Sequence, residues 1–405
     1  MQSILHLNRN PLKFILFVCL GFYFSYSQQA APDSLKKFKI DYGSKGFEFS
    51  TPSDKFKLQI QSRFQFRYAT PDDQDPVTFT DFTDERTSVF KINRARLKVG
   101  GHAYQTWLKY YWEYDFVNSN LLDFRLMIEK WKWLNFKVGQ WKLEFTRERR
   151  ISSGEQQLVD RSIINRPFTV DRQQGVEIYG HIEDKGLLDF NYWLAVTTGT
   201  GRGSFENDDK NLMYFGRLQW NFFGRELGFE SSDLEIHKKP AGILAISAVT
   251  NRSQFTRFST SGGGSLFGFE DGLNGQYRIN QINIETALAY MGFSWQSEFH
   301  RKNIIDRFNN NERTELQGYY LQAGYFFHQT LSWWPEPLEL AFRYADYEPN
   351  RGIGLHQVER SVNANWFFNG HKNKLSLELS HFDAELSDNS VEERWRFRIQ
   401  WDISF

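Results

Sequence analysis

The sequence predicts an all-β protein, a transmembrane antiparallel β-barrel of about sixteen strands. Three observations predict it: an apolar segment near the N-terminus, an alternation of apolar and polar residues along most of the chain, and a final strand in which that alternation is complete. Successive side chains of a strand point to opposite faces. A strand that contacts lipid on one face and water on the other therefore alternates in this way.

The N-terminus has the pattern of a secretory signal. An apolar run from Phe14 to Phe24 follows Lys13, and small residues follow the run. The run is too short to span a bilayer as a helix but has the length of a signal-peptide core. We expect residues 1–27 to be this signal, and a short buried helix is the alternative. Cys19, the one cysteine, lies inside it, so the mature chain would have no disulfide.

The composition fits a barrel better than a soluble domain. No apolar run after the signal reaches about eighteen residues, so no transmembrane helix is expected. The mean hydropathy of −0.57 suggests a soluble protein, but only alternate residues of a barrel strand meet lipid. The aromatic content of 17% is high enough for girdles at both membrane interfaces. Lys+Arg and Asp+Glu number 49 each, so bulk charge predicts no nucleic-acid partner.

The strands begin after a polar stretch. Residues 28–53 contain scattered prolines and glycines and predict a periplasmic lead-in, with the barrel at 54–405. The first strand alternates large apolar residues with Lys, Gln and Arg. The same alternation predicts strands near 55–68, 93–101, 108–116, 122–129, 134–141, 173–182, 187–197, 211–222, 241–254, 277–290, 292–302, 315–327, 338–347, 357–367, 374–383 and 394–405.

The connections between these strands alternate in length. Short ones, such as 130–133 and 368–372, are expected to be periplasmic turns. Long ones are expected to face outward: 69–88, 142–172, 199–210, 257–276 and 303–313. A soluble β-sandwich would also alternate, but its strands are usually about 5–6 residues long. Many strands here run about 10–13 residues, near the length that a tilted strand needs to cross a bilayer.

The last strand carries the clearest pattern. Every second residue from Trp395 to Phe405 is large and apolar, and every residue between them is polar or charged. A chain that ends on such a strand with a terminal aromatic resembles bacterial outer-membrane barrels. Their assembly machinery reads that ending, so Phe405 is the candidate assembly signal. The expected partners are this barrel assembly machinery and outer-membrane lipid, and the expected location is the bacterial outer membrane.

The polar faces of the strands predict a charged lumen. About sixteen strands leave a water-filled channel, and closure places the last strand beside the first. Three adjacent strands then present a basic stripe: Lys55, Lys57, Arg63, Arg67, Arg94, Arg96, Lys98, Arg394, Arg396 and Arg398. The next strands present opposing acidic residues: Glu113, Asp115 and Asp123. A stripe of one sign would favour anions. Alternatively, these charges pair across neighbouring strands.

The connection at 142–172 is the longest and shows no clear alternation. A long loop without secondary structure is usually functional or disordered. In so wide a barrel it could fold inward and narrow the channel, or it could be an ordinary surface loop. Its cations are the candidate constriction residues: Arg147, Arg149, Arg150, Arg161 and Arg166.

Several segments together resemble the phosphate-selective porin O and P family, over roughly residues 55–405. They are Asn93-Arg94-Ala95-Arg96-Leu97, Tyr114-Asp115-Phe116, Val138-Gly139-Gln140-Trp141, Ser152-Ser153, Asp160-Arg161-Ser162, 175–180, 318–326 and 339–344. The resemblance implies trimers of sixteen-stranded barrels, with an arginine ladder and a loop cation that draw in phosphate. Arg94, Arg96 and Arg161 are the candidates for these cations. A lysine can follow the serine pair in the family pattern, whereas Gly154 follows it here, which argues against strict phosphate selectivity.

The sequence does not predict an enzyme. Its nine histidines are scattered, and the chain has no His-x-x-x-His, no Gly-x-Ser-x-Gly and no cysteine cluster. No cofactor and no metal are expected. The prediction is a homotrimeric porin for passive diffusion of small anionic solutes. The alternatives are a non-selective general porin and a plugged structural or adhesive barrel, and single-channel recording separates them.

Overall fold

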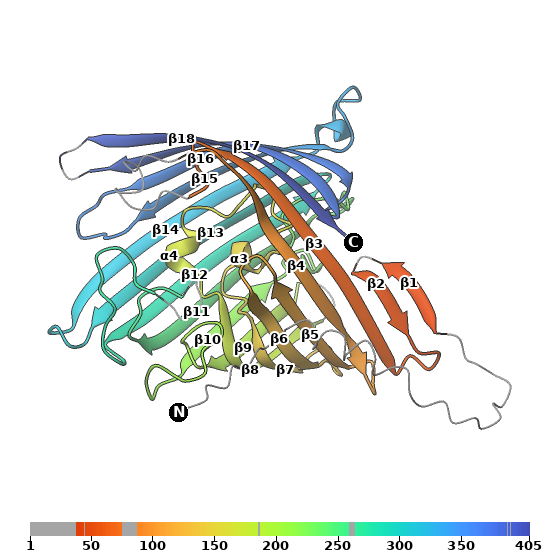
Figure 1. The fold of residues 1–405 in the computed structure, drawn as a ribbon, viewed down its shortest axis with the longest axis horizontal. Helices are drawn as coiled ribbons and strands as arrows, with labels where there is room; N and C mark the ends of the chain where they lie inside the picture. The colour runs from red at the N-terminus through yellow and green to blue at the C-terminus, as the bar shows by residue number, and fades with distance from the viewer. Residues whose placement is uncertain are drawn as a thin grey trace, which may run out of the picture. The chain divides into compact units, whose positions relative to one another are not determined.

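The computed structural model describes residues 38–43, 45–74, 87–184, 187–258, 264–386, 388 and 390–405. The expected signal at 1–27 lies outside these residues. Over the described part of the chain, sixteen strands form a closed antiparallel barrel, as predicted (Figure 1). The strands are β3 (Phe56–Thr70), β4 (Val89–Ala103), β5 (Leu108–Asp115), β6 (Asn120–Ile128), β7 (Asn135–Lys142), β8 (Arg172–Glu183), β9 (Asp189–Thr197), β10 (Met213–Trp220), β11 (Ala241–Ser253), β12 (Tyr277–Tyr290), β13 (Phe293–Asp306), β14 (Glu312–Tyr325), β15 (Leu338–Glu348), β16 (Gln357–Asn369), β17 (Asn373–Glu385) and β18 (Val391–Ser404).

The barrel closes between its last and first strands. β18 pairs antiparallel with β3, from Ser404 opposite Arg63 to Phe397 opposite Thr70. Each of the other strands pairs antiparallel with its neighbours in the sequence. Closure pairs residues 397–404 of β18 with β3, so these parts of the two strands are not free sheet edges.

A short hairpin precedes the barrel. β1 (Lys39–Gly43) pairs with β2 (Gly46–Ser50), and β2 pairs with residues 57–60 of β3 (Figure 1). These residues belong to the expected lead-in at 28–53. Because β18 reaches only residues 63–70 of β3, the hairpin occupies the part of the β3 edge that β18 leaves unpaired.

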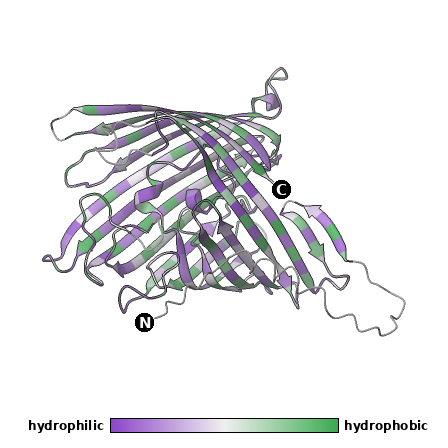
Figure 2. Ribbon diagram, viewed as in Figure 1, coloured by the Kyte–Doolittle hydropathy of each residue, from purple (hydrophilic) through white to green (hydrophobic). Residues whose placement is uncertain are grey.

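Strand residues alternate between an apolar outer face and an inner face. Figure 2 shows the resulting bands along the strands. Phe66, Phe124, Leu194 and Val362 are exposed on the outer face. In β18, Arg396, Arg398 and other polar residues are buried, whereas the aromatic residues between them are exposed. This is the arrangement of a barrel whose solvent on the outside is lipid.

The connections only partly follow the expected alternation in length. One end of the barrel carries the loops at 71–88, 143–171, 198–212 and 254–276, and we call it the loop end; we call the opposite end the turn end. The loop end also carries a connection of four residues, 116–119. Two connections at the turn end are long: 221–240, and 326–337 with a 3₁₀ turn, Phe327–Gln329.

The interior contains an apolar cluster that the polar inner faces did not predict. Inward-facing residues of β10 to β15 at the loop end contact apolar residues of the loop at 143–171. They are Phe215, Val249, Ile279, Ile304 and Leu316, against Phe145, Ile164, Phe168 and Val170. Among the described residues, no helix is long and apolar enough to cross a membrane.

Candidate functional site: the barrel interior

The connection between β7 and β8, residues 143–171, lies inside the barrel; we call it L3. It carries two one-turn helices, α3 (Arg147–Arg150) and α4 (Asn165–Phe168). Thr146 caps α3, since its hydroxyl accepts a hydrogen bond of 3.2 Å from the backbone N–H of Arg149. L3 spans the interior because its side chains and backbone reach inward-facing residues of β3 and of β12 to β17.

Gln157 fixes the tip of L3. Its Nε2 donates to Ser294 Oγ at 2.8 Å and to Glu339 Oε1 at 2.6 Å, and its Oε1 accepts from Gln322 Nε2 at 3.0 Å. The backbone carbonyl of Gln157 accepts from the side-chain amides of Asn363 and Asn365. Every polar group of this buried side chain that can bond to the wall does so, which is the condition for a stable buried polar contact.

Inward-facing carboxylates hold the backbone of L3. Glu298 accepts from the N–H of Arg147, Glu378 from that of Val159 at 2.8 Å, and Glu359 from that of Ile163 at 2.9 Å. These glutamates belong to β13, β17 and β16. Charge-assisted hydrogen bonds of this kind are stronger than neutral ones. We call the inner face of β12 to β17, where they lie, the docked wall.

Arg343 completes the docked wall. Its Nε lies 2.8 Å from Glu359 Oε1, and its Nη1 donates to the carbonyl of Asp160 at 2.8 Å. Its Nη1 also lies 3.7 Å from Glu148 Oε1 in L3. The Arg343 and Glu359 side chains are each 1% exposed, so this is a buried ion pair.

The long connection at the turn end also enters the barrel. Residues 221–240, which we call the inserted turn, place Phe229 beside the guanidinium groups of Arg147, Arg150 and Arg217. The carbonyls of Gly228 and Glu230 accept from Arg147 Nη2. The inserted turn therefore contacts L3 directly and holds α3 from the turn end.

The inner face of β4 to β8, which we call the open wall, differs from the docked wall. In several ion pairs on or beside this wall, one formed by Arg96 of β4 and two formed within L3, the arginine is more exposed than its acidic partner. Arg150 is 30% exposed and Glu144 2%; Arg149 is 19% and Asp171 8%; Arg96 is 12% and Asp115 2%. A solute beside this wall meets guanidinium groups before it meets the carboxylates behind them. Asp160 of L3, at 23%, is an exception, and so is Arg172 of β8, which is 2% exposed against 6% for Asp123.

The predicted basic stripe lies on three adjacent strands, and most of its cations have partners. Arg67 pairs with Asp73 and Asp160, Arg94 with Asp160, and Arg96 with Glu113 and Asp115. Arg394 pairs with Asp72, and Arg398 with Glu378 and Asp73.

The remaining cations of the stripe make other contacts. Arg396 donates to the carbonyl of Gln74 and lies over the ring of Phe382. Lys57 pairs with Glu48 of β2, and Lys55 lies exposed before β3. The inward position of Lys98 follows from its register opposite Glu113.

Arg63 contacts the serine pair of L3. Its Nη1 donates to Ser152 Oγ at 2.7 Å, and its Nε to Ser404 Oγ at 3.3 Å. A Cβ on Gly154 would lie 2.4 Å from Arg63 Cζ, so glycine at this position lets the guanidinium lie against the loop. A cation supplied by β3 thus occupies the space beside the serine pair.

The predicted opposing carboxylates are neighbours of the stripe in the sheet. Glu113 and Asp115 lie on β5, where they register opposite Lys98 and Arg96. Asp123 on β6 accepts from Arg172 Nε at 2.6 Å. The acidic residues therefore neutralise cations by direct contact along one wall.

The five predicted loop cations separate into three groups. Arg147 docks against Glu285, Glu298 and the inserted turn. Arg149, Arg150 and Arg161 bind within L3: Arg149 pairs with Asp171, Arg150 with Glu144, and Arg161 donates to the carbonyls of Glu148 and Ile151. Arg166 lies in α4 at the loop end, away from the other four.

Burial perturbs two ionisable groups of L3. Burial, together with the nearby positive charges of Arg149 and Arg94, lowers the pKa of the Arg161 guanidinium to about 9. Burial raises the pKa of the Glu148 carboxyl to about 7; Arg343 opposes this shift and Glu298 adds to it. The hydroxyl and N–H of Ser162 both donate to Glu148.

Sequence reasoning missed Gln157, Arg172, Arg343 and the inserted turn. Arg172 lies at the first position of β8 and binds Asp123. A usable signal was present, since inward positions of β11 and β12 near the turn end are small or apolar. Ala241, Ile243, Ala245, Ala287 and Ala289 form a cluster with Leu227 of the inserted turn. Apolar residues facing a water-filled interior require a cover.

One group of described residues has the geometry of a cation site. His381, Asp383 and Glu393 bring ligand atoms within 4.8 Å of one another on the outer face of β17 and β18. Asp383 already forms an ion pair with Arg360. The group lies outside the barrel interior, and we assign it no function.

One known protein family matches most of the chain. The family described as phosphate-selective porin O and P matches residues 60–401. No curated relative matches the chain by sequence.

Solved porin structures share the fold. An anion-selective porin from Comamonas acidovorans is 10% identical, with a TM-score of 0.52 over 86% of this chain and 99% of that one. The outer membrane channel DcaP of Acinetobacter baumannii is 9% identical, with a TM-score of 0.55 over 88% and 99%. A trimer form of OmpT, an outer membrane protein of Vibrio cholerae, is 9% identical, with a TM-score of 0.52 over 87% and 100%.

Proposed function

Because the chain belongs to the phosphate-selective porin O and P family, we propose that this porin is an anion-preferring channel of the bacterial outer membrane. It lets small anionic solutes, with phosphate-like anions as the family's example, diffuse along the open wall. It is a channel and has no catalytic role. A non-selective general porin is the alternative.

The observation that carries the proposal is the difference in exposure between arginines and the carboxylates that they bind, at and beside the open wall. Arg96, Arg149 and Arg150 each present a guanidinium that is more exposed than the carboxylate it binds. The field near the wall is dominated by the nearest charges, and a low-dielectric surround strengthens it. An anion beside L3 is therefore stabilised although the chain has no net charge.

We predict that Arg94→Gln/Arg96→Gln shifts the reversal potential in a KCl gradient toward cation preference. The double change removes two guanidinium groups and leaves Asp160, Glu113 and Asp115 without these partners. The shift should shrink as salt rises, because the screening length falls to about 10 Å at 0.1 M. Planar-bilayer recording measures it.

Two further variants control this experiment. Asp160→Asn removes the exposed carboxylate and should move the reversal potential the opposite way. Arg301→Gln makes the same type of change on the outer face and should leave it in place, since Arg301 is exposed and pairs with Glu315 outside the barrel. Cation preference in the wild type, or equal values for the double variant and Arg301→Gln, would refute the proposal.

We also propose that the barrel assembly machinery recognises the terminal strand and that the porin is a homotrimer. The trimer is supported by family membership and by the trimer form of the Vibrio cholerae protein. Phe405 takes part in barrel closure: its N–H donates to the Ser62 carbonyl at 3.1 Å, and its carbonyl accepts from the Ser62 N–H at 2.6 Å.

Deletion of Phe405 should lower the amount of folded barrel in outer-membrane fractions without lowering synthesis. The change removes the terminal aromatic and both backbone contacts with Ser62. Heat-modifiable mobility in gels measures the folded fraction. Phe405→Tyr keeps the ring and the backbone and should assemble normally. Normal assembly of the truncated chain would refute a role for this residue.

A further inference from the structure

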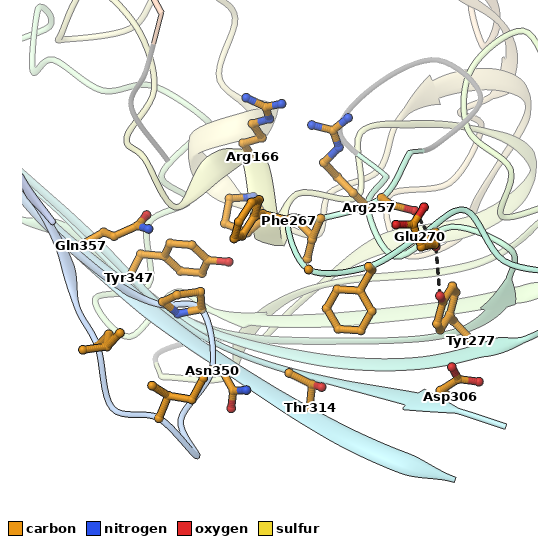
Figure 3. A pocket seen from close by; sticks show the side chains of 18 of the residues that line it. Arg166, Arg257, Phe267, Glu270, Tyr277, Asp306, Thr314, Tyr347, Asn350 and Gln357 are labelled. Atoms are coloured by element: carbon orange, nitrogen blue, oxygen red, sulfur yellow. Dashed lines mark hydrogen bonds between the residues drawn. The ribbon is translucent and has the colours of Figure 1, made fainter. Parts of the chain in front are cut away.

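A cavity of about 1010 Å³ lies at the loop end, and we call it the vestibule. Its lining comes from L3, from the connections that follow β11, β15 and β17, and from the ends of β12, β13 and β14. Arg166, Arg257, Phe267 and Tyr347 are among its lining residues, and Figure 3 shows the two guanidinium groups at one edge of the cavity. The vestibule thus combines cations with an aromatic surface.

Neither vestibule arginine forms an ion pair within the described part of the chain. Arg257 Nε is buried and has no hydrogen-bond partner there. Burial lowers the pKa of Arg257, and the positive charge of Arg166 lowers it further, although Asp271 opposes this. Two guanidinium groups that repel each other at the mouth of a cavity are stabilised by an anion that binds both.

The carboxylates of the vestibule, in contrast, mostly have partners. Asp306 accepts from the N–H of Phe308 and from Gln276 Nε2, each at 3.0 Å. Glu312 accepts from Asn309, and Glu385 accepts from the N–H of His356 at 3.0 Å. These three carboxylates have hydrogen-bond partners within the loops, and Glu270 and Asp388 also line the cavity.

The size and lining of the vestibule exceed what an inorganic anion needs. Small-molecule sites usually measure about 300–1,000 Å³ and are mostly apolar, with a few placed polar groups. Phe267 and Ile353 are highly exposed side chains on its wall, and Tyr347 packs edge-on against Phe168 of L3. A phosphate ion would contact the arginines and leave the aromatic surface bare.

We propose that the vestibule binds amphipathic organic anions, with the anionic group on Arg166 and Arg257 and an aromatic or apolar body on Phe267 and Tyr347. The inference rests on the proposed function, because it names the class of anion that the channel collects. Arg166 is part of L3, so a bound solute lies on the same loop that borders the open wall.

Planar-bilayer recording with phenyl phosphate tests the proposal. Phenyl phosphate is added on the loop side, and inorganic phosphate and benzyl alcohol supply the anionic group alone and the aromatic body alone. Phenyl phosphate should block the current with an apparent Kd about ten-fold below that of phosphate, a difference typical of one buried ring. Benzyl alcohol should block more weakly than phenyl phosphate.

Loop variants assign the two halves of the site. Phe267→Ala should abolish the advantage of phenyl phosphate over phosphate. Arg166→Gln/Arg257→Gln should weaken phenyl phosphate block about ten-fold or more, since hydrogen bonds to charged groups are lost. Arg313→Gln is the matched control, because Arg313 lies at the loop end, pairs with Glu315 and is not part of the cavity lining.

The outcomes separate this inference from the proposed function. Equal block by phenyl phosphate and phosphate in an anion-preferring channel would overturn the vestibule site alone. Unchanged block in Arg166→Gln/Arg257→Gln would also overturn it. Cation preference in KCl together with tight, arginine-dependent block would overturn the proposed function and support the site.

Discussion

The docked wall and the open wall are built from the same alternating strands, but they use their charges differently. On the docked wall, Arg343 with Glu359, and Arg398 of β18 with Glu378 beside it, are pairs in which both side chains are at most 1% exposed. On the open wall, Arg96 is 12% exposed while its partner Asp115 is 2% exposed. The same residue types therefore fix a loop on one side and face solutes on the other. Charge type alone does not reveal which role a residue has; the presence of L3 against the wall decides it.

The largest expected difference between the walls is in stability. Arg343→Gln leaves Glu359 buried without its cation, and breaking a buried pair in this way costs about 3–5 kcal/mol. Arg125→Gln on the open wall removes a partly exposed arginine that pairs with Asp123 at 3.4 Å. That change should cost less than Arg343→Gln, because Arg125 keeps partial access to solvent. Urea unfolding in liposomes measures both, and equal losses would contradict the distinction between the walls.

A smaller loss of stability is expected when a side chain is added to the wall where it contacts Gln157. A Cβ at Gly324 would lie 1.9 Å from Gln157 Nε2 and 2.8 Å from Glu339 Oε1. Gly324→Ala should displace the tip of L3, at a cost of about 1–3 kcal/mol for overpacking. It should also raise conductance or current noise in planar bilayers.

Gly100→Ala is the matched change on the open wall. Its Cβ would meet Tyr111 Cδ2 at 3.3 Å and does not reach L3. Conductance should stay near the wild-type value. If both alanine variants alter the current equally, docking of L3 does not depend on this contact.

A third expected effect is the pH dependence of L3 docking through Glu148. Its pKa is raised to about 7 in the folded protein, from an ordinary value of 4.5. The folded state therefore holds this proton more tightly, so the contribution is fully present below pH 4.5 and is lost as pH rises through 7.

Glu148→Gln keeps a neutral side chain at every pH. The wild type should lose unfolding free energy relative to this variant between pH 5.5 and pH 8.5, measured by urea unfolding in liposomes. A constant difference between the two proteins across this range would show that Glu148 does not titrate in the docked loop.

The strands could be predicted from the sequence because their signal is local. Two-residue alternation identifies a strand and its outer face without knowledge of any partner, and β12 was placed at 277–290, as the structure has it. The resemblance of scattered segments indicated the family. Outward residues such as Ile399 and inward residues such as Gln400 also followed from alternation.

The docking of L3 could not be predicted in the same way. Gln157 binds Asn365, 208 positions away, and the sequence around these two residues does not predict the contact. The sequence predicts that polar inner faces line water, whereas those of the docked wall line a loop. The inward apolar residues Phe215 and Ile304 were the available sign that part of the interior is covered.

The hairpin of β1 and β2 has a consequence for how the barrel avoids wrong partners. The edge of β3 at residues 57–60 would otherwise offer free N–H and C=O groups, which can recruit a strand from another chain. β2 satisfies this stretch, and β18 satisfies residues 63–70. The two strands do not compete, because they bind different parts of the same edge. The edge of β3 is thus shared between the chain's beginning and its end.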